Sequence, residues 1–132
     1  MRIAIIFLVL MSVLGCGSKK QPADKPAVPG APAVVNIAME NASTNSLNAV
    51  EIEWKGPNVS GGIVMAGTAA TILDVEWPSV PSATLTFIDY KTRTPYKIAI
   101  SLAAANEQVN AGGIQKVTFR ILSYDKAVVV CE

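Results

Sequence analysis

The feature that most constrains the fold of this chain is an alternation of apolar and polar residues that recurs along residues 34–132. Successive side chains of a β-strand point to opposite faces, so this period of two predicts strands with one buried face. The predicted inward-facing sets are Val50, Ile52 and Trp54; Leu73, Val75 and Trp77; Leu85 and Phe87; Ile98, Ile100 and Leu102; and Val117, Phe119 and Ile121. Apolar runs at residues 34–39, 63–65 and 127–131 predict further strands, and the last is expected to be covered on both faces.

Glycine and proline separate these runs. Glycine permits a positive φ and proline cannot donate to a strand ladder, so both favour turns, here at residues 56–58, 61–62, 78–81, 92–95 and 112–113. Residues 103–107 are expected to form one short helical turn. Seven or eight strands at this spacing predict an all-β fold, a two-sheet antiparallel β-sandwich, with a small barrel as the alternative. The strand pattern is similar to the immunoglobulin-like or transthyretin-like sandwiches of many small periplasmic lipoproteins.

The start of the chain has a different character. Arg2 precedes an apolar run over residues 3–14, and Gly15 is a small residue directly before Cys16. These are the parts of a secretory signal, and a run of about a dozen residues is shorter than the roughly 20 that a spanning helix needs. A cysteine directly after the small residue resembles the lipobox of bacterial lipoproteins. The resemblance implies cleavage before Cys16 and acylation of its thiol, which becomes the first mature residue.

Three segments are therefore expected along the chain. Residues 1–15 form the cleaved signal peptide, residues 16–33 form the lipidated cysteine with a proline-rich tether, and residues 34–132 form the sandwich domain. Proline-rich chain is extended and semi-rigid, so the tether is a spacer. Acyl chains contribute about 0.8 kcal/mol per buried methylene, which holds a protein on a membrane without a spanning helix. Gly17 is not the aspartate that favours inner-membrane retention in such lipoproteins, so we expect a periplasm-facing protein of the outer membrane.

Composition excludes several classes of function. The chain has no histidine, which removes the commonest general base, the histidine-dependent triads and most zinc sites. Its formal net charge is +1, and with no basic face evident a nucleic-acid partner is not expected. We therefore predict a protein that is not an enzyme and needs no metal or cofactor. Cys131 lacks a partner once Cys16 is lipidated, and it is interpreted as a buried small hydrophobe or, alternatively, as an intermolecular disulfide partner.

The most distinctive exposed patch predicted from the sequence surrounds the turn at residues 92–95. Its members are both basic and aromatic: Tyr90, Lys91, Arg93, Tyr96 and Lys97. Tyrosine and arginine are favoured at protein interfaces, so this patch is a candidate binding site for an acidic partner, a sugar phosphate or peptidoglycan. The alternative is an ordinary solvated hairpin tip.

Trp54 and Trp77 each close an apolar alternation. Packing in the core or at its rim is the default interpretation, and a stacking site for sugar rings is the alternative. Two acidic pairs occupy the predicted outer faces of the same strands: Glu51 with Glu53, and Asp74 with Glu76. They are interpreted as a charged solvent face, with a calcium site as the alternative if their strands are neighbours.

These observations favour a lipid-anchored envelope protein with a non-catalytic binding or structural domain. Its expected partner is another envelope protein, engaged through a loop end or an exposed strand edge. A carbohydrate- or cell-wall-binding module using Trp54, Trp77 and Tyr90 is the alternative. A hydrolase ranks last, because histidine is absent and no nucleophile motif is present.

Overall fold

Residues 32–132 are the part of the chain that the structure, a computed structural model, describes. They form eight strands and one helix: β1 (Val34–Asn41), β2 (Leu47–Glu53), β3 (Val59–Val64), β4 (Ala69–Glu76), β5 (Ser82–Asp89), β6 (Pro95–Ser101), α1 (Ala103–Ala111), β7 (Lys116–Ser123) and β8 (Lys126–Cys131). The predicted signal peptide, the lipidation of Cys16 and nearly all of the predicted tether lie outside these residues.

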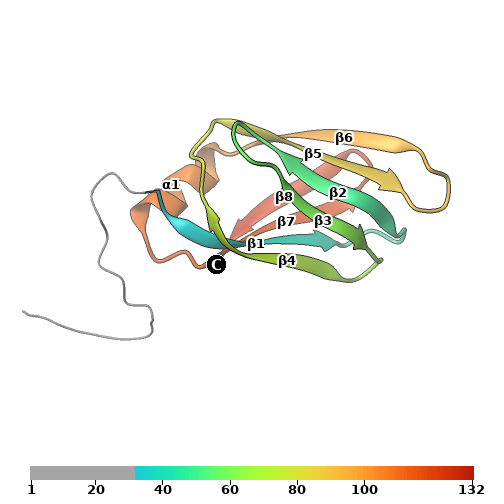
Figure 1. Ribbon diagram of the computed structural model, residues 1–132, viewed down its shortest axis with the longest axis horizontal. Coiled ribbons are helices and arrows are strands. Elements are labelled where there is room, and N and C mark those ends of the chain that lie inside the picture. Colours follow the sequence, from blue (N-terminus) through green and yellow to red (C-terminus); the bar gives the residue numbers. More distant parts are fainter. Residues whose placement is uncertain (1–31) are drawn as a thin grey trace, which may run out of the picture. The chain divides into compact units, whose positions relative to one another are not determined.

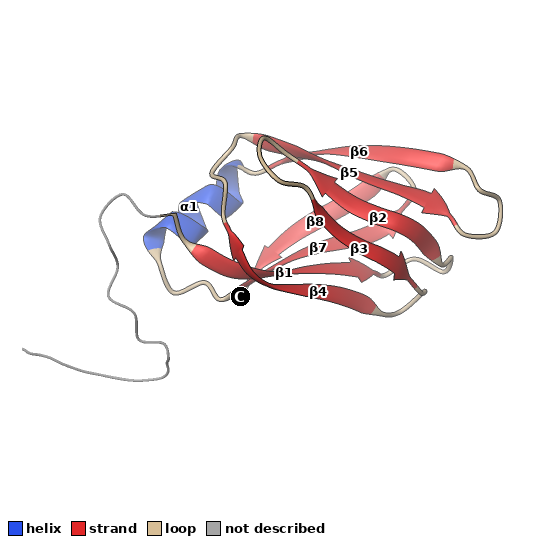
Figure 2. Cartoon of the chain, viewed as in Figure 1, coloured by secondary structure: helices blue, strands red, loops and turns tan. Residues whose placement is uncertain are grey.

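The strands form two facing sheets of four, with α1 at one end of the sandwich (Figures 1 and 2). One sheet has the order β4-β1-β7-β8 and the other β3-β2-β5-β6. The predicted all-β two-sheet sandwich is confirmed, and the barrel alternative is excluded. An immunoglobulin domain keeps its first, second, fourth and fifth strands in one sheet. The strand order here differs from that arrangement.

One strand pair departs from the predicted antiparallel arrangement. β1 and β7 lie side by side in parallel, with residue 36 opposite residue 116 and residue 41 opposite residue 121. A parallel pair needs a crossover connection rather than a tight turn, and the chain reaches β7 only after crossing from the other sheet through α1. The local alternation of apolar and polar residues does not indicate which strand pairs with β1.

The core lies between the sheets and is filled mainly by the predicted inward sets. Their buried members are Val50, Ile52, Trp77, Leu85, Phe87, Ile98, Ile100, Leu102, Val117, Phe119 and Ile121. Burying one such side chain contributes roughly 1.5–3 kcal/mol, so this shared core accounts for most of the stabilisation that holds the sheets together.

The prediction that Leu73 faces the core is wrong. Its side chain is 66% exposed, and the neighbouring Ile72 packs against the core instead. The cause is a β-bulge: between Val35 and Ile37 of β1 the register with β4 shifts, so β4 contains one extra residue. Asp74, in the bulge, has a φ of 56°. Such an extra residue reverses the faces of the strand on one side of it.

Two further expectations are corrected. β8 pairs only with β7 and is therefore an edge strand; Val128 is 37% exposed and its neighbours are half-buried, so coverage on both faces is wrong. The predicted single helical turn is a nine-residue helix, α1. Its buried residues Ala105 and Val109 lie one turn apart and pack against the core, which stabilises the longer helix.

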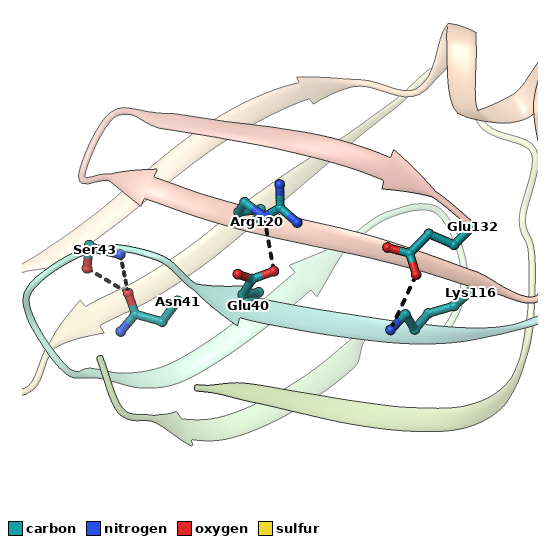
Figure 3. Close-up of polar contacts among 6 residues, drawn as sticks. All are labelled: Glu40, Asn41, Ser43, Lys116, Arg120 and Glu132. Carbon is teal, nitrogen blue, oxygen red and sulfur yellow. Dashed lines mark hydrogen bonds and ion pairs between the residues drawn. The ribbon is translucent and has the colours of Figure 1, made fainter. Parts of the chain in front are cut away.

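The buried side-chain amide of Asn41 stabilises the end of β1 through hydrogen bonds. Asn41 is fully buried, and its side-chain oxygen accepts hydrogen bonds from the backbone N–H (3.0 Å) and hydroxyl (2.6 Å) of Ser43 (Figure 3). Its side-chain nitrogen donates to the backbone oxygens of Asn45 (2.7 Å) and Val64 (2.9 Å). This residue therefore joins the β1–β2 turn to the end of β3.

Candidate functional site

The residues predicted to bind a partner divide between the two ends of the sandwich. β2 and β4, which precede Trp54 and Trp77, both end near α1, whereas β5 ends at the opposite side (Figure 1). On β2, Glu53 is opposite residue 84 and Leu47 is opposite Asp89, so roughly 20 Å of strand separates the two ends. The tryptophans and the basic turn therefore belong to two different sites.

The structure brings the two tryptophans together. Their ring centroids are 5.6 Å apart in a T-shaped contact. Trp77 is only 2% exposed, and its indole N–H donates to the side-chain oxygen of Asn106 on α1 (2.7 Å). Trp54 is half-buried, and its indole N–H donates to the backbone oxygen of Pro57 (2.9 Å). Trp77 is thus a core residue, and Trp54 lies at the rim of the core.

A groove of about 950 Å³ opens beside Trp54, between the edge strands β3 and β4. Its apolar lining comes from both sheets: Trp54, Val59, Ile72, Val75, Trp77 and Val80. Exposed charged residues at the groove are Lys55, Asp74 and Glu76, so β4 contributes two carboxylates against one ammonium. The sequence pattern did not reveal this groove, because it depends on how two edges from different sheets face each other.

Irregularities in both edge strands accompany the groove. In β4 the bulge at Asp74 is held by Asn36, whose side-chain oxygen accepts a hydrogen bond from the Asp74 backbone N–H (3.1 Å). In β3 the register with β2 shifts near Gly62, which has a φ of 69°. Within residues 32–132, β3 and β4 are not paired in a ladder. Bulges bend a strand and increase its twist, so neither edge presents a regular strand to the other.

Gly61 allows β3 to lie close to the opposite sheet. A Cβ atom at this position would be 2.8 Å from Cε of Met39 and 3.2 Å from Cβ of Ala70. Glycine is therefore the residue that permits this close approach. Farther along, Val59 of β3 and Val75 of β4 both line the groove between the sheets.

The opposite end of the sandwich is organised by a carboxylate that sequence reasoning missed. Asp89 is 2% exposed and accepts hydrogen bonds from the backbone N–H groups of Lys91 (2.9 Å) and Thr92 (2.8 Å) and from the Tyr124 hydroxyl. The bond from Tyr124 and those from the backbone hold the pKa of the Asp89 carboxyl below its ordinary value, and the same carboxylate raises the pKa of Tyr124 to about 12. An aspartate before a turn is a local signal for the backbone bonds. Nothing local points to a tyrosine 35 residues away.

The predicted basic patch is present only in part. Lys91, Arg93 and Lys97 are exposed, and Tyr90 is 53% exposed. Tyr96 is half-buried, however, and stacks on Tyr124 with ring centroids 4.2 Å apart and planes 3° from parallel. The exposed patch therefore has three basic residues and one tyrosine, and Tyr96 belongs to the packing beneath it.

The two acidic pairs are not brought together. Glu51 and Glu53 lie on β2 in one sheet, and Asp74 and Glu76 lie on β4 in the other. In residues 32–132 no three His, Cys, Asp or Glu side chains are placed to hold a metal ion. Cys131 is half-buried on β8, and burial raises the pKa of its thiol.

The outer face of the sheet that contains β1 and β7 carries two cross-strand ion pairs (Figure 3). Nε of Arg120 lies 3.0 Å from a carboxylate oxygen of Glu40, and Nζ of Lys116 lies 3.6 Å from one of Glu132. These side chains are about one third to one half exposed, and such pairs contribute at most about 1 kcal/mol. Their charges are matched within the chain, so this face offers less for a partner than the groove does.

Comparison with known proteins adds little to this site. Neither a protein-family model nor a curated protein sequence matches the chain. An NMR structure of a protein from Eubacterium rectale resembles it over 75% of this chain and 88% of its own, at 11% sequence identity and a TM-score of 0.45; a likeness of this size carries no argument about function. Between residues 32 and 132, no helix has the length and apolar character needed to cross a membrane.

Proposed function

We propose that this chain is a lipid-anchored protein of the cell envelope whose sandwich domain is a non-catalytic module that binds another envelope protein at the groove between β3 and β4. The anchor is supported by the lipobox-like sequence that ends at Cys16. The single observation that carries the binding role is the groove itself, an apolar hollow of about 950 Å³ bordered by two edge strands. Grooves and unpaired strand edges of this kind are common sites for protein segments.

The alternative, a carbohydrate- or cell-wall-binding module, has less support. Sugar rings stack on exposed aromatic faces, but Trp77 is 2% exposed and donates its indole N–H within the protein. Tyr90 lies at the opposite end of the sandwich and is not available to the groove. Trp54 would be left as the single stacking surface, and apolar residues dominate the remaining lining. A protein segment fits this lining better, since its apolar side chains bury there.

The anchor is tested by the substitution Cys16→Ser in the cell that makes the protein. We expect loss of lipid labelling and of membrane association, because serine does not offer the thiol that is acylated. The measurement is fractionation of the envelope together with metabolic labelling by a fatty acid. Unchanged labelling and fractionation would show that the anchor is not at this cysteine.

The binding role is tested by photocrosslinking in the same cells. A photoreactive phenylalanine derivative at Leu73, on the rim of the groove, is expected to capture a specific protein. Leu122 on β7 is the matched control, since it is also exposed and lies outside the groove. Adducts with glycan alone at Leu73 would favour the cell-wall alternative, and identical adducts at both positions would contradict a site at the groove.

A further inference from the structure

We propose that the groove takes an extended segment of the partner, added as a strand along β4, in which apolar side chains facing the groove alternate with lysine or arginine beside Asp74 and Glu76. This inference rests on the proposed function and specifies its ligand. The partner is thus defined by chemistry, as an alternating apolar and basic strand.

The free edge of β4 supplies the backbone contacts. β4 has eight residues and pairs with β1 on one side only. Every second residue of an edge strand directs its backbone N–H and C=O outward, where a further strand can pair with them. Strand addition of this kind takes its affinity from main-chain hydrogen bonds and its specificity from pockets for alternate side chains.

The floor of the groove sets the side-chain pattern of the ligand. Ile72 and Val75 are half-buried members of β4 that line the groove, and Trp54 faces them from the end of β2. An added strand would turn every second side chain toward this apolar surface and the others toward solvent. Apolar residues at alternate positions therefore fit the floor.

The bulge in β4 favours a partner segment over a second copy of this chain. It turns Leu73 outward, so that an apolar side chain 66% exposed lies on the rim. It also keeps Asp74 at a positive φ, a conformation that is costly for a residue other than glycine. A bulge twists a strand edge away from a regular partner strand. A short flexible segment can follow the bend, whereas a second rigid sheet cannot.

Charge sets the other half of the pattern. Asp74 and Glu76 are exposed on β4, and among residues 32–132 Lys55 is the one exposed cation in the groove lining. Opposite charges across an interface suppress wrong partners and speed association. Lysine or arginine on the ligand therefore fits this edge, and a glutamate would be repelled.

The test uses the detergent-solubilised lipidated protein and two blocked peptides of about seven residues, one alternating valine with lysine and one alternating valine with glutamate. We expect the lysine peptide to change the fluorescence of Trp54 and to bind at least about tenfold more tightly than the glutamate peptide. In the double variant Asp74→Asn and Glu76→Gln the preference should disappear. The matched control is Glu51→Gln with Glu53→Gln, an acidic pair on β2 that is not part of the groove. It should retain the preference.

Several results would overturn this inference. Equal binding of both peptides, no binding of either, or the same loss of preference in the β2 control would each contradict it. A concentration-dependent dimer that the lysine peptide does not dissociate would show that a second copy fills the groove, and protection of Trp54 by residues 16–31 of the same chain would show that the tether does. A protein adduct at Leu73 together with any of these results would leave the proposed function standing and remove only the strand ligand.

Discussion

On the side of the sandwich where β6 faces β8, aromatic rings pack between the sheets at the end near the β5–β6 turn, whereas on the side where β3 faces β4 a groove remains. Tyr96 of β6 stacks on Tyr124 at 4.2 Å, and Phe87 lies behind it at 5.8 Å. Tyr124 in turn donates its hydroxyl to the buried Asp89. This side is closed by side chains and by a satisfied polar contact.

The β3–β4 side has the opposite construction. Gly61 lets β3 lie close to the opposite sheet, the groove opens next to this contact, and the bulge in β4 directs Leu73 outward. The two sides of the sandwich therefore differ: aromatic rings pack between the sheets on one, and a groove beside a bulged edge strand remains on the other. The difference leaves the β3–β4 side as the one with an accessible apolar groove.

The largest expected effect is at the floor of the open side. Trp77→Ala should lower the free energy of unfolding by about 3–5 kcal/mol, because it empties a buried site and leaves Asn106 without its donor. Trp54→Ala should cost less, about 1–2 kcal/mol, since that ring is half-buried. Urea denaturation followed by circular dichroism measures both. Equal losses would contradict the assignment of Trp77 to the core and of Trp54 to its rim.

The next effect concerns the closed side and depends on pH. The pKa of Tyr124 is raised from 10.0 to about 12, so its contribution to stability is fully present below pH 10 and is lost as the pH rises from 10 to 12. The pKa of Asp89 is lowered, so its contribution is present above its ordinary value of 3.8 and is lost as the pH falls below that value. Tyr124→Phe should abolish the loss of stability between pH 10 and 12 and reduce the loss of stability at acidic pH. Urea midpoints from pH 3 to pH 12 measure both.

Tyr90→Phe is the control for that experiment. Tyr90 belongs to the same turn but is 53% exposed. Its variant should keep the pH dependence of the natural chain. If the loss of stability between pH 10 and 12 disappears equally in both variants, the contact between Tyr124 and Asp89 does not cause it.

A smaller effect is expected at the bulge. Asn36→Ala removes the acceptor for the Asp74 backbone N–H and should cost about 0.5–1 kcal/mol, because water replaces the lost bond at this exposed position. Asn36→Asp keeps an oxygen acceptor and should cost less. Denaturation gives the stability, and the amide chemical shift of Leu73 reports on the bulge. An unchanged shift in the alanine variant would show that Asn36 does not hold the bulge.

The smallest change in stability is expected for Leu73→Ser, and its contrast with Tyr96→Ser distinguishes the two sides of the sandwich. Leu73→Ser on the open side should change stability by less than about 0.5 kcal/mol, since the side chain is largely in solvent. Tyr96→Ser on the closed side should cost about 2 kcal/mol, because it breaks the ring stack. The two variants are compared by urea denaturation under identical conditions. A large loss in the Leu73 variant would show that the rim is part of the core.

Much of the sandwich could be predicted because alternation is a local property. The pattern placed Ile52, Phe87, Ile100 and Phe119 in the core correctly. It failed at Leu73, because one extra residue in a strand reverses the faces and leaves no signal in the spacing. The parallel pairing of β1 with β7 was also beyond it, since the choice of partner depends on the path of the whole chain.

The candidate site was less predictable for the same reason. Clustering of Trp54 with Trp77 joins the ends of two strands in different sheets, and the contact of Tyr124 with Asp89 spans 35 residues. Neither follows from neighbours in the sequence. The exposed lysines of the basic turn could be predicted, because a hairpin tip is polar wherever it lies. The inward position of Tyr96 could not.

The parallel pair at the centre of one sheet also has a kinetic consequence. β1, the first strand of the described chain, cannot gain its inner neighbour until β7 is present, and the paired residues 36 and 116 are 80 positions apart. Contacts so distant in sequence slow folding, because a long loop must close before they form. A chain delivered from its N-terminus therefore keeps this sheet incomplete until nearly all of the domain has emerged.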